Sequence, residues 1–143
     1  MSGRTYAHQL DAKNRMRIPA KMREELGQNY TIMAGSNKCL YVYPEKKAEK
    51  IISKLRTINP FDEKKQAAAR KLLSLTWQAE EDKQGRILIP ENIRAHAEIS
   101  KNVLLFYGPS CIELWAEDVW TDYISKVDLS CLADVFENSD DNE

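Results

Sequence analysis

The sequence contains one unusual stretch twice, and this duplication constrains the fold more than any other feature. Residues 11–23 read DAKNRMRIPAKMR, and residues 82–94 read DKQGRILIPENIR. After a one-residue insertion the similarity continues, so that the copies span 11–55 and 82–127. A solenoid needs three or more stacked repeats to bury its faces. Two copies therefore favour a closed, pseudo-symmetric pair.

Each copy begins with the pattern of two strands joined by a tight turn. Residues 4–10 have strand character, and a second apolar stretch follows the break DAKN. Asn14 and Gly85 hold the same place in the two breaks, and both residue types tolerate positive φ. Pro19 and Pro90 end the second strand and open a short helix, because proline fits the first helical turn.

The remainder of each copy predicts two more strands and a closing helix. The strands are 30–34 and 39–43 in the first copy, and 102–107 and 111–115 in the second. Apolar residues at helical spacing then mark the closing helices. These residues are Ala48, Ile51, Ile52 and Leu55 in the first copy, and Val119, Trp120, Tyr123, Ile124 and Val127 in the second.

The segment between the copies, NPFDEKKQAAARKLL, predicts a helical connector and not a flexible linker. Asn59 is a good N-cap, with Pro60 at the first helical position. Alanine has the highest helix propensity, and three of them follow one another here. The chain is thus divided into a first unit, 4–55, a connector, 56–74, a second unit, 75–127, and an acidic tail, 128–143, with disorder expected beyond Glu137.

A single copy would be a poor domain, because a hairpin of such short strands is marginal in water. Two copies that interleave their hairpins would share one hydrophobic core. The predicted class is α+β, mainly β with short helices and a pseudo-two-fold axis. In this arrangement the internal duplicate takes the place of a second subunit.

Charge is distributed very unevenly along the chain, although the net charge is only −1. Residues 1–23 carry six cations against one anion, and residues 128–143 carry six anions and no cation. Such polarity is typical of a basic binding surface with an acidic tail. Two solvated ends would give the same pattern, so charge alone leaves both interpretations open.

The sequence offers no catalytic pattern. It contains no nucleophile elbow, no phosphate-binding glycine loop and no metal motif, so we expect neither an enzyme nor a cofactor. Three cysteines without a CxxC pair fit free thiols in a reducing compartment. No apolar run approaches the roughly 18 residues that span a bilayer, and residues 1–11 lack the apolar core expected of a signal peptide. We therefore expect a cytoplasmic protein without a membrane partner.

The two motifs DAKNR and DKQGR, the RIP and LIP strand ends and the CLYVYP strand resemble the swapped-hairpin β-barrel of the AbrB superfamily. Two such units around this connector resemble the MraZ family over residues 4–127. The resemblance implies a duplicated AbrB-like barrel. It also implies a repressor of the bacterial division and cell wall gene cluster, its own promoter included. A further implication is a ring-like homo-oligomer, associated with the nucleoid, that binds repeated short promoter sites.

The resemblance places the DNA contacts in the DxxxR region. Arg15 and Arg86 are the candidate base readers, because arginine can lie bidentate on guanine in the major groove. Asp11 and Asp82 should accept turn amides, and each could also pair with its arginine; we expect the amides to satisfy them and to leave both guanidinium groups free. Asn14 and Gly85 complete the turns. The other candidate DNA contacts are cations suited to phosphate: Lys13, Arg17, Lys21 and Lys83.

Two of these positions depart from the family pattern. Asn14 stands where glycine is usual in the first motif, and Arg17 stands where a small polar residue is common. Asparagine should preserve the turn. The sequence assigns no role to the extra charge of Arg17. Two further arginines, Arg23 and Arg94, fall on the short helices, where a structural role is expected.

Two functions of different kinds remain open. The first is a DNA-binding repressor, whose partners are double-stranded promoter DNA and further copies of the chain, without a small-molecule substrate. The second is an antitoxin-like interaction module, in which the same barrel presents the C-terminal tail to a protein. The tail has little apolar content after Phe136, which favours the repressor.

Overall fold

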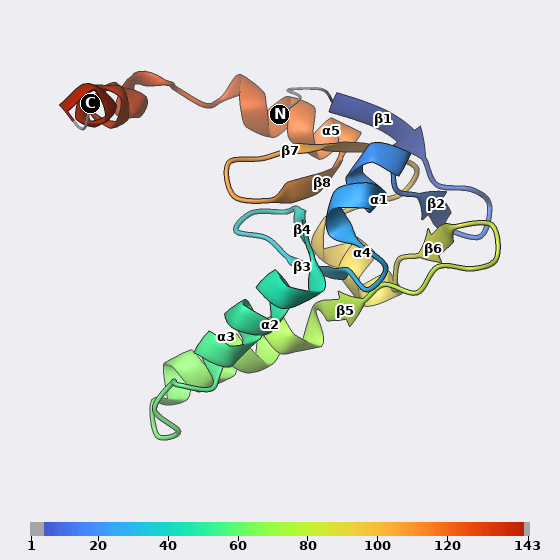
Figure 1. Ribbon diagram of the computed structural model, residues 1–143, viewed down its shortest axis with the longest axis horizontal. Helices are drawn as coiled ribbons and strands as arrows, with labels where there is room; N and C mark the ends of the chain where they lie inside the picture. The colour runs from blue at the N-terminus through green and yellow to red at the C-terminus, as the bar shows by residue number, and fades with distance from the viewer. Residues whose placement is uncertain (1–4, 142–143) are drawn as a thin grey trace.

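The computed structural model describes residues 5–141, which form an α+β fold with two antiparallel sheets (Figure 1). The strands are β1 (Thr5–Gln9), β2 (Arg15–Arg17), β3 (Thr31–Ala34), β4 (Leu40–Tyr43), β5 (Thr76–Gln78), β6 (Arg86–Leu88), β7 (Asn102–Tyr107) and β8 (Ile112–Ala116). The helices are α1 (Ala20–Leu26), α2 (Glu45–Leu55), α3 (Glu63–Ser74), α4 (Glu91–His96), α5 (Glu117–Ser125), the 3-10 turn η1 (Ser130–Leu132) and α6 (Ala133–Asp141).

The two sequence copies exchange their first strands. The larger sheet has the order β1-β7-β8-β4-β3-β5, so β1 of the first copy pairs with β7 of the second. In the same way β5 of the second copy pairs with β3 of the first. At the centre of the sheet β4 pairs with β8, and Tyr41 lies opposite Glu113, its own counterpart in the other copy. The interleaving predicted from the duplication is therefore present, with a pseudo-two-fold axis through the sheet.

The expectation of a closed barrel is wrong. Within residues 5–141, β1 and β5 are the two edges of an open six-stranded sheet, and no strand joins them. The strands that would complete a barrel, β2 and β6, are three residues long and pair only with each other. Each lies beyond a tight turn that directs the chain out of the large sheet. The result is a separate two-stranded ribbon that covers the core.

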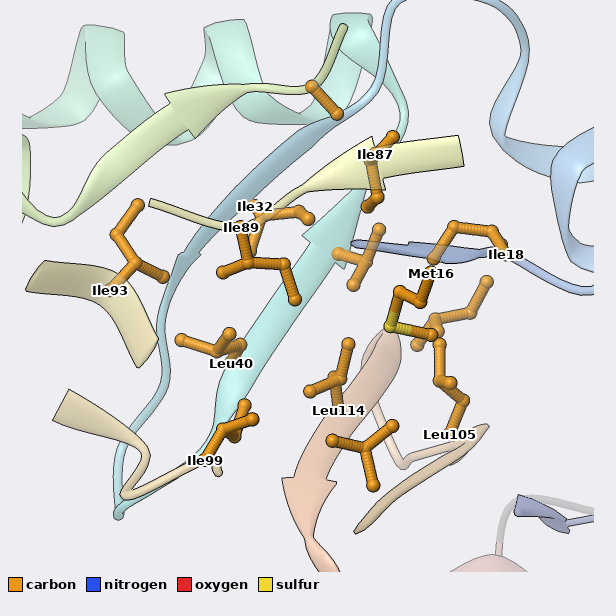
Figure 2. Close-up of a cluster of buried hydrophobic side chains, with 14 of the residues drawn as sticks. Met16, Ile18, Ile32, Leu40, Ile87, Ile89, Ile93, Ile99, Leu105 and Leu114 are labelled. Carbon is orange, nitrogen blue, oxygen red and sulfur yellow. The ribbon is translucent and has the colours of Figure 1, made fainter. Parts of the chain in front are cut away.

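The hydrophobic core lies between this ribbon and the large sheet, and both copies contribute to it (Figure 2). Met16 and Ile87 of the ribbon are buried above Leu40 and Leu114 from the two central strands. Complete burial of such a side chain contributes about 1.5–3 kcal/mol. The copies share this main cluster, and a smaller one, formed by Met33, Tyr43 and Ala48, lies in the first copy. The main cluster is the shared core that the duplication predicts.

Helices α2 and α3, joined by residues 56–62, project from the sheet as an arm (Figure 1). The expected N-cap of the connector helix is wrong by three positions. Asp62 caps α3 by accepting from the Lys65 amide at 3.1 Å, whereas Asn59 Oδ1 accepts from the Phe61 amide. Asn59 and Pro60 therefore belong to a turn that precedes the helix.

The acidic tail leaves α5 and ends in helix α6, which stands away from the rest of the molecule (Figure 1). The sequence predicts disorder beyond Glu137, but α6 continues to Asp141; residues 142 and 143 lie outside the described residues. None of the helices within residues 5–141 has the length and apolar content needed to cross a bilayer.

Candidate nucleic-acid interface

The β2–β6 ribbon and the two loops that precede it form one end of the molecule, at the right of Figure 1. The loops, residues 11–14 and 82–85, carry the sequence motifs DAKN and DKQG. Four of the six candidate DNA-binding cations are exposed at or next to this end: Lys13, Arg17, Lys21 and Lys83. Lys21 is on the first turn of α1 and not in a loop.

The first loop is organised by the carboxylate of Asp11. Its Oδ1 accepts from the backbone amides of Lys13 and Arg15, each at 2.9 Å. Asn14 adopts a positive φ of 61°, as the tight turn requires. The hydrogen bond from the Arg15 amide is the largest cause that lowers the pKa of Asp11. The loop is thus most stable with an ionised Asp11.

The second loop repeats this arrangement. Asp82 Oδ1 accepts from the amides of Gln84 at 2.8 Å and Arg86 at 2.9 Å, and Gly85 has φ 76°. The hydrogen bond from the Arg86 amide likewise lowers the pKa of Asp82. Two loops from distant parts of the sequence therefore share one geometry.

The expectation that both guanidinium groups are free is wrong. Asp11 Oδ2 accepts from Arg15 Nε at 2.9 Å, and Asp82 Oδ2 accepts from Arg86 Nε at 2.9 Å. The arginine side chains are only 25% and 24% exposed. A guanidinium has five N–H donors. Among residues 5–141, neither Nη1 nor Nη2 of these arginines forms a hydrogen bond. Each carboxylate therefore orients its arginine through Nε, and the Nη1 and Nη2 donors stay available.

The two loops are also tied to each other. Arg17 Nε donates to the backbone carbonyl of Gln84 at 2.7 Å, and Arg86 Nη1 lies 4.0 Å from Asp11 Oδ2. Arg17 thus links the loop of the second copy to the ribbon strand of the first. No sequence signal indicates this contact, because its acceptor is a main-chain oxygen. Its counterpart in the second copy, Leu88, is exposed and makes the interface asymmetric.

The expectation of structural roles for Arg23 and Arg94 is confirmed by their contacts. Arg23 on α1 donates to both carboxylate oxygens of Glu81, at 2.8 and 2.6 Å, and Tyr30 donates to the same group at 3.0 Å. Hydrogen bonding to Glu81 raises the pKa of Arg23, and burial is the largest cause that raises the pKa of Tyr30. Arg94 Nε donates to the Ile89 carbonyl at 2.8 Å. Arg23 is thus held through two of its donors and Arg94 through its Nε, each by a partner within the fold.

Comparison with known proteins agrees with this duplicated architecture. A family described as "MraZ protein, putative antitoxin-like" matches the chain twice, over residues 1–71 and 72–141. The chain belongs to the MraZ family. Its two MraZ repeats contain the two DxxxR loops and divide the chain within α3.

Several MraZ relatives match almost the whole chain. The transcriptional regulator MraZ of Thermoanaerobacter sp. (strain X514) is 40% identical over 95% of this chain and 94% of its own length. That of Clostridium acetobutylicum is 37% identical over 90% of this chain and 92% of its own. The transcriptional regulator MraZ of Thermoanaerobacter pseudethanolicus is 40% identical over 87% of both chains. Membership of this family confirms the expectation that the chain is not an enzyme.

Proposed function

We propose that this MraZ protein binds double-stranded DNA through the β2–β6 ribbon and its two loops. The observation that carries the proposal is the pair of aspartate-held arginines, Arg15 and Arg86, at one cation-rich end of the fold. A two-stranded β-ribbon fits the major groove of B-DNA, and arginine pairs with guanine O6 and N7 there. An arginine fixed by a carboxylate loses less conformational entropy on binding, which favours specific contact.

The surrounding cations supply affinity that does not depend on sequence. Lys13, Lys21 and Lys83 are exposed and have no ion-pair partner among residues 5–141, so they are available to phosphate oxygens. Arg17 joins them with the N–H donors that Gln84 does not use. Each phosphate neutralised releases counterions, and binding should weaken steeply as salt rises.

The biological role proposed is repression of the division and cell wall gene cluster, including the protein's own promoter, from a nucleoid-associated position in the cytoplasm. Relatives named transcriptional regulator MraZ support regulation of transcription. Two arginine contacts of about 1–3 kcal/mol each give one chain limited discrimination. A higher homo-oligomer, such as a ring, would present many loops to repeated short sites and gain avidity.

The second candidate is an antitoxin-like interaction module, which the family description also names. Helix α6 favours it, because Val135 and Phe136 are exposed on a helix that stands clear of the body. This function would need the tail and not the loops. The loop geometry makes DNA binding the better supported of the two.

Gel retardation on the chain's own upstream DNA, at two salt concentrations, separates the candidates. DNA binding predicts retardation that weakens at higher salt and is lost when Arg15 and Arg86 are both replaced by alanine. Deletion of residues 128–143 should leave contact with a single site intact. Absence of retardation at low salt, with the protein folded, would refute the proposed function.

A further inference from the structure

The arm formed by α2 and α3, residues 45–74, is strongly basic. It carries nine cations against four anions. Lys46, Lys50, Lys54, Lys64 and Lys65 are all exposed, and none forms a salt bridge with another residue of the described chain. The arm also exposes apolar groups, most of all Phe61 at its tip, whose exposed fraction is 93%. A basic and partly apolar surface of this kind attracts an acidic amphipathic partner.

The C-terminal segment, residues 128–141, has the complementary composition. Val135 and Phe136 on α6 are exposed, and so are Leu129 and Leu132 at the preceding turn η1, with exposed fractions of 72% for Leu129 and 65% for Phe136. The tail from residue 128 onward carries six anions and no cation. The adjoining turn η1 contacts α6 without covering these side chains. The apolar face is therefore uncovered in the isolated chain.

The two surfaces belong to different regions of one molecule. In Figure 1 the arm and α6 extend away from the body in diverging directions, and the projection separates their ends widely. A projection shortens distances and never lengthens them, so the separation is real. The C-terminal segment thus does not cover the arm of its own chain, but it can reach the arm of a neighbouring copy.

We propose that the C-terminal segment of one chain docks on the α2–α3 arm of the next. Acidic side chains would face the arm lysines, while the apolar face of α6 packs on the arm and removes Phe136 and Phe61 from water. Such a contact joins two different surfaces, so it is heterologous and repeats from copy to copy. It closes into a ring when the rotation per subunit permits and otherwise extends as a filament. The inference rests on the oligomer in the proposed function and specifies its interface.

The loop end of the molecule is the other basic surface to which an acidic tail could bind. It is the less suitable site, because β2 and β6 bury Met16 and Ile87 and leave Leu88 as the large exposed apolar residue of the ribbon. A tail bound there would compete with DNA and would not join chains in series. Charge reversal in the two basic surfaces distinguishes these sites.

The test uses sedimentation velocity on the full-length chain at low ionic strength. One variant reverses the arm with Lys50→Glu and Lys54→Glu, and another reverses the tail with Asp134→Lys and Glu137→Lys. All four side chains are exposed, and none takes part in a hydrogen bond or salt bridge among residues 5–141, so each variant should remain folded. A variant with Lys13→Glu and Lys21→Glu is the matched control, since its charge changes by the same amount as in the arm variant.

We expect the arm and tail variants each to sediment as a smaller species than the wild type. An equimolar mixture should recover the large species, because each reversed surface then meets its complement on the other chain. The loop control should retain its size and lose DNA retardation. Unchanged size in the tail variant, no recovery on mixing, or dissociation in the loop control alone would overturn the interface. A monomeric wild type that still retards DNA would reject the interface and leave DNA binding intact.

Discussion

Met16 of β2 lies directly opposite Ile87 of β6, and each is the counterpart of the other in the two sequence repeats. The ribbon is therefore centred on the same pseudo-two-fold axis as the central strands of the large sheet, where Tyr41 faces Glu113. The two copies of the repeated motif meet on this axis, and this brings both aspartate–arginine loops to one end of the fold. Arg17 and Leu88 occupy equivalent positions in β2 and β6, and this difference makes the ribbon asymmetric.

The first prediction concerns the two oriented arginines. Arg15→Ala should reduce affinity for target DNA by about 10- to 100-fold, the loss expected for one bidentate base contact. Arg86→Ala should have a comparable effect, because Arg17 lies opposite Arg86 in the ribbon and Lys83 is in its loop. Ion pairs at a protein surface add little stability, so both melting temperatures should remain near that of the wild type. Fluorescence anisotropy and thermal melting on the same preparations measure the two effects, and a large fall in melting temperature would make these arginines structural.

Arg23→Ala provides the matched contrast. This arginine holds Glu81, to which Tyr30 also donates, and it connects α1 of the first repeat with the segment before the second loop. Its removal should lower the melting temperature clearly while DNA affinity changes much less at a temperature where the protein is folded. If affinity fell as far as in Arg15→Ala with stability unchanged, Arg23 would belong to the interface.

A third prediction tests the turns. Gly85 has φ 76°, and a side chain in the left-handed region costs about 1–2 kcal/mol. An added Cβ would meet Arg23 Nη1 at 3.8 Å, an ordinary contact, so the cost comes from the backbone and not from crowding. Gly85→Ala should therefore lower the free energy of unfolding by about this amount. Asn14→Gly, at the equivalent position, should be close to neutral in the same denaturant titration.

The repeat was enough to predict strand exchange, a shared core and the positions of the tight turns, because each follows from local pattern and symmetry. Whether the sheet closes into a barrel was not predictable in this way. It depends on whether β2 and β6 continue the large sheet or pair with each other, and three-residue strands carry no signal for this choice. The candidate site shows the same division: the spacing from Asp11 to Arg15 is visible in the sequence, but the contact from Arg17 to the Gln84 carbonyl is tertiary.

The fourth prediction concerns acid stability. Hydrogen bonds from the loop amides lower the pKa of Asp11 and Asp82 in the folded state, so the unfolded chain binds protons more readily. The resulting stabilisation is complete above the unfolded aspartate pKa of about 3.9 and is lost as the pH falls through the lower folded value. The doubly substituted Asp11→Asn, Asp82→Asn protein should be less stable than the wild type from pH 5 to 8 by a constant amount. Below about pH 4 the two stability curves should converge. Thermal melts from pH 2 to 8 would show this, and a difference that persisted at pH 2 would point to a cause other than ionisation.

The last prediction concerns the dependence of each repeat on the other. A fragment of residues 1–58 retains β1 but lacks β7, with which β1 pairs, and it retains β2 without β6. It also exposes the face of Leu40 that packs with residues of the second repeat. Such a fragment should be unfolded as a monomer, or should dimerise so that a second copy supplies the missing strands.

In the full chain, Ile87→Ala should lower the free energy of unfolding by about 2–5 kcal/mol, because Ile87 is fully buried where the repeats meet. An exposed neighbour in the same strand, tested as Leu88→Ala, should change it far less. Circular dichroism and sedimentation equilibrium on the fragment decide the matter, since a folded monomeric half would show that the second repeat is dispensable for the core.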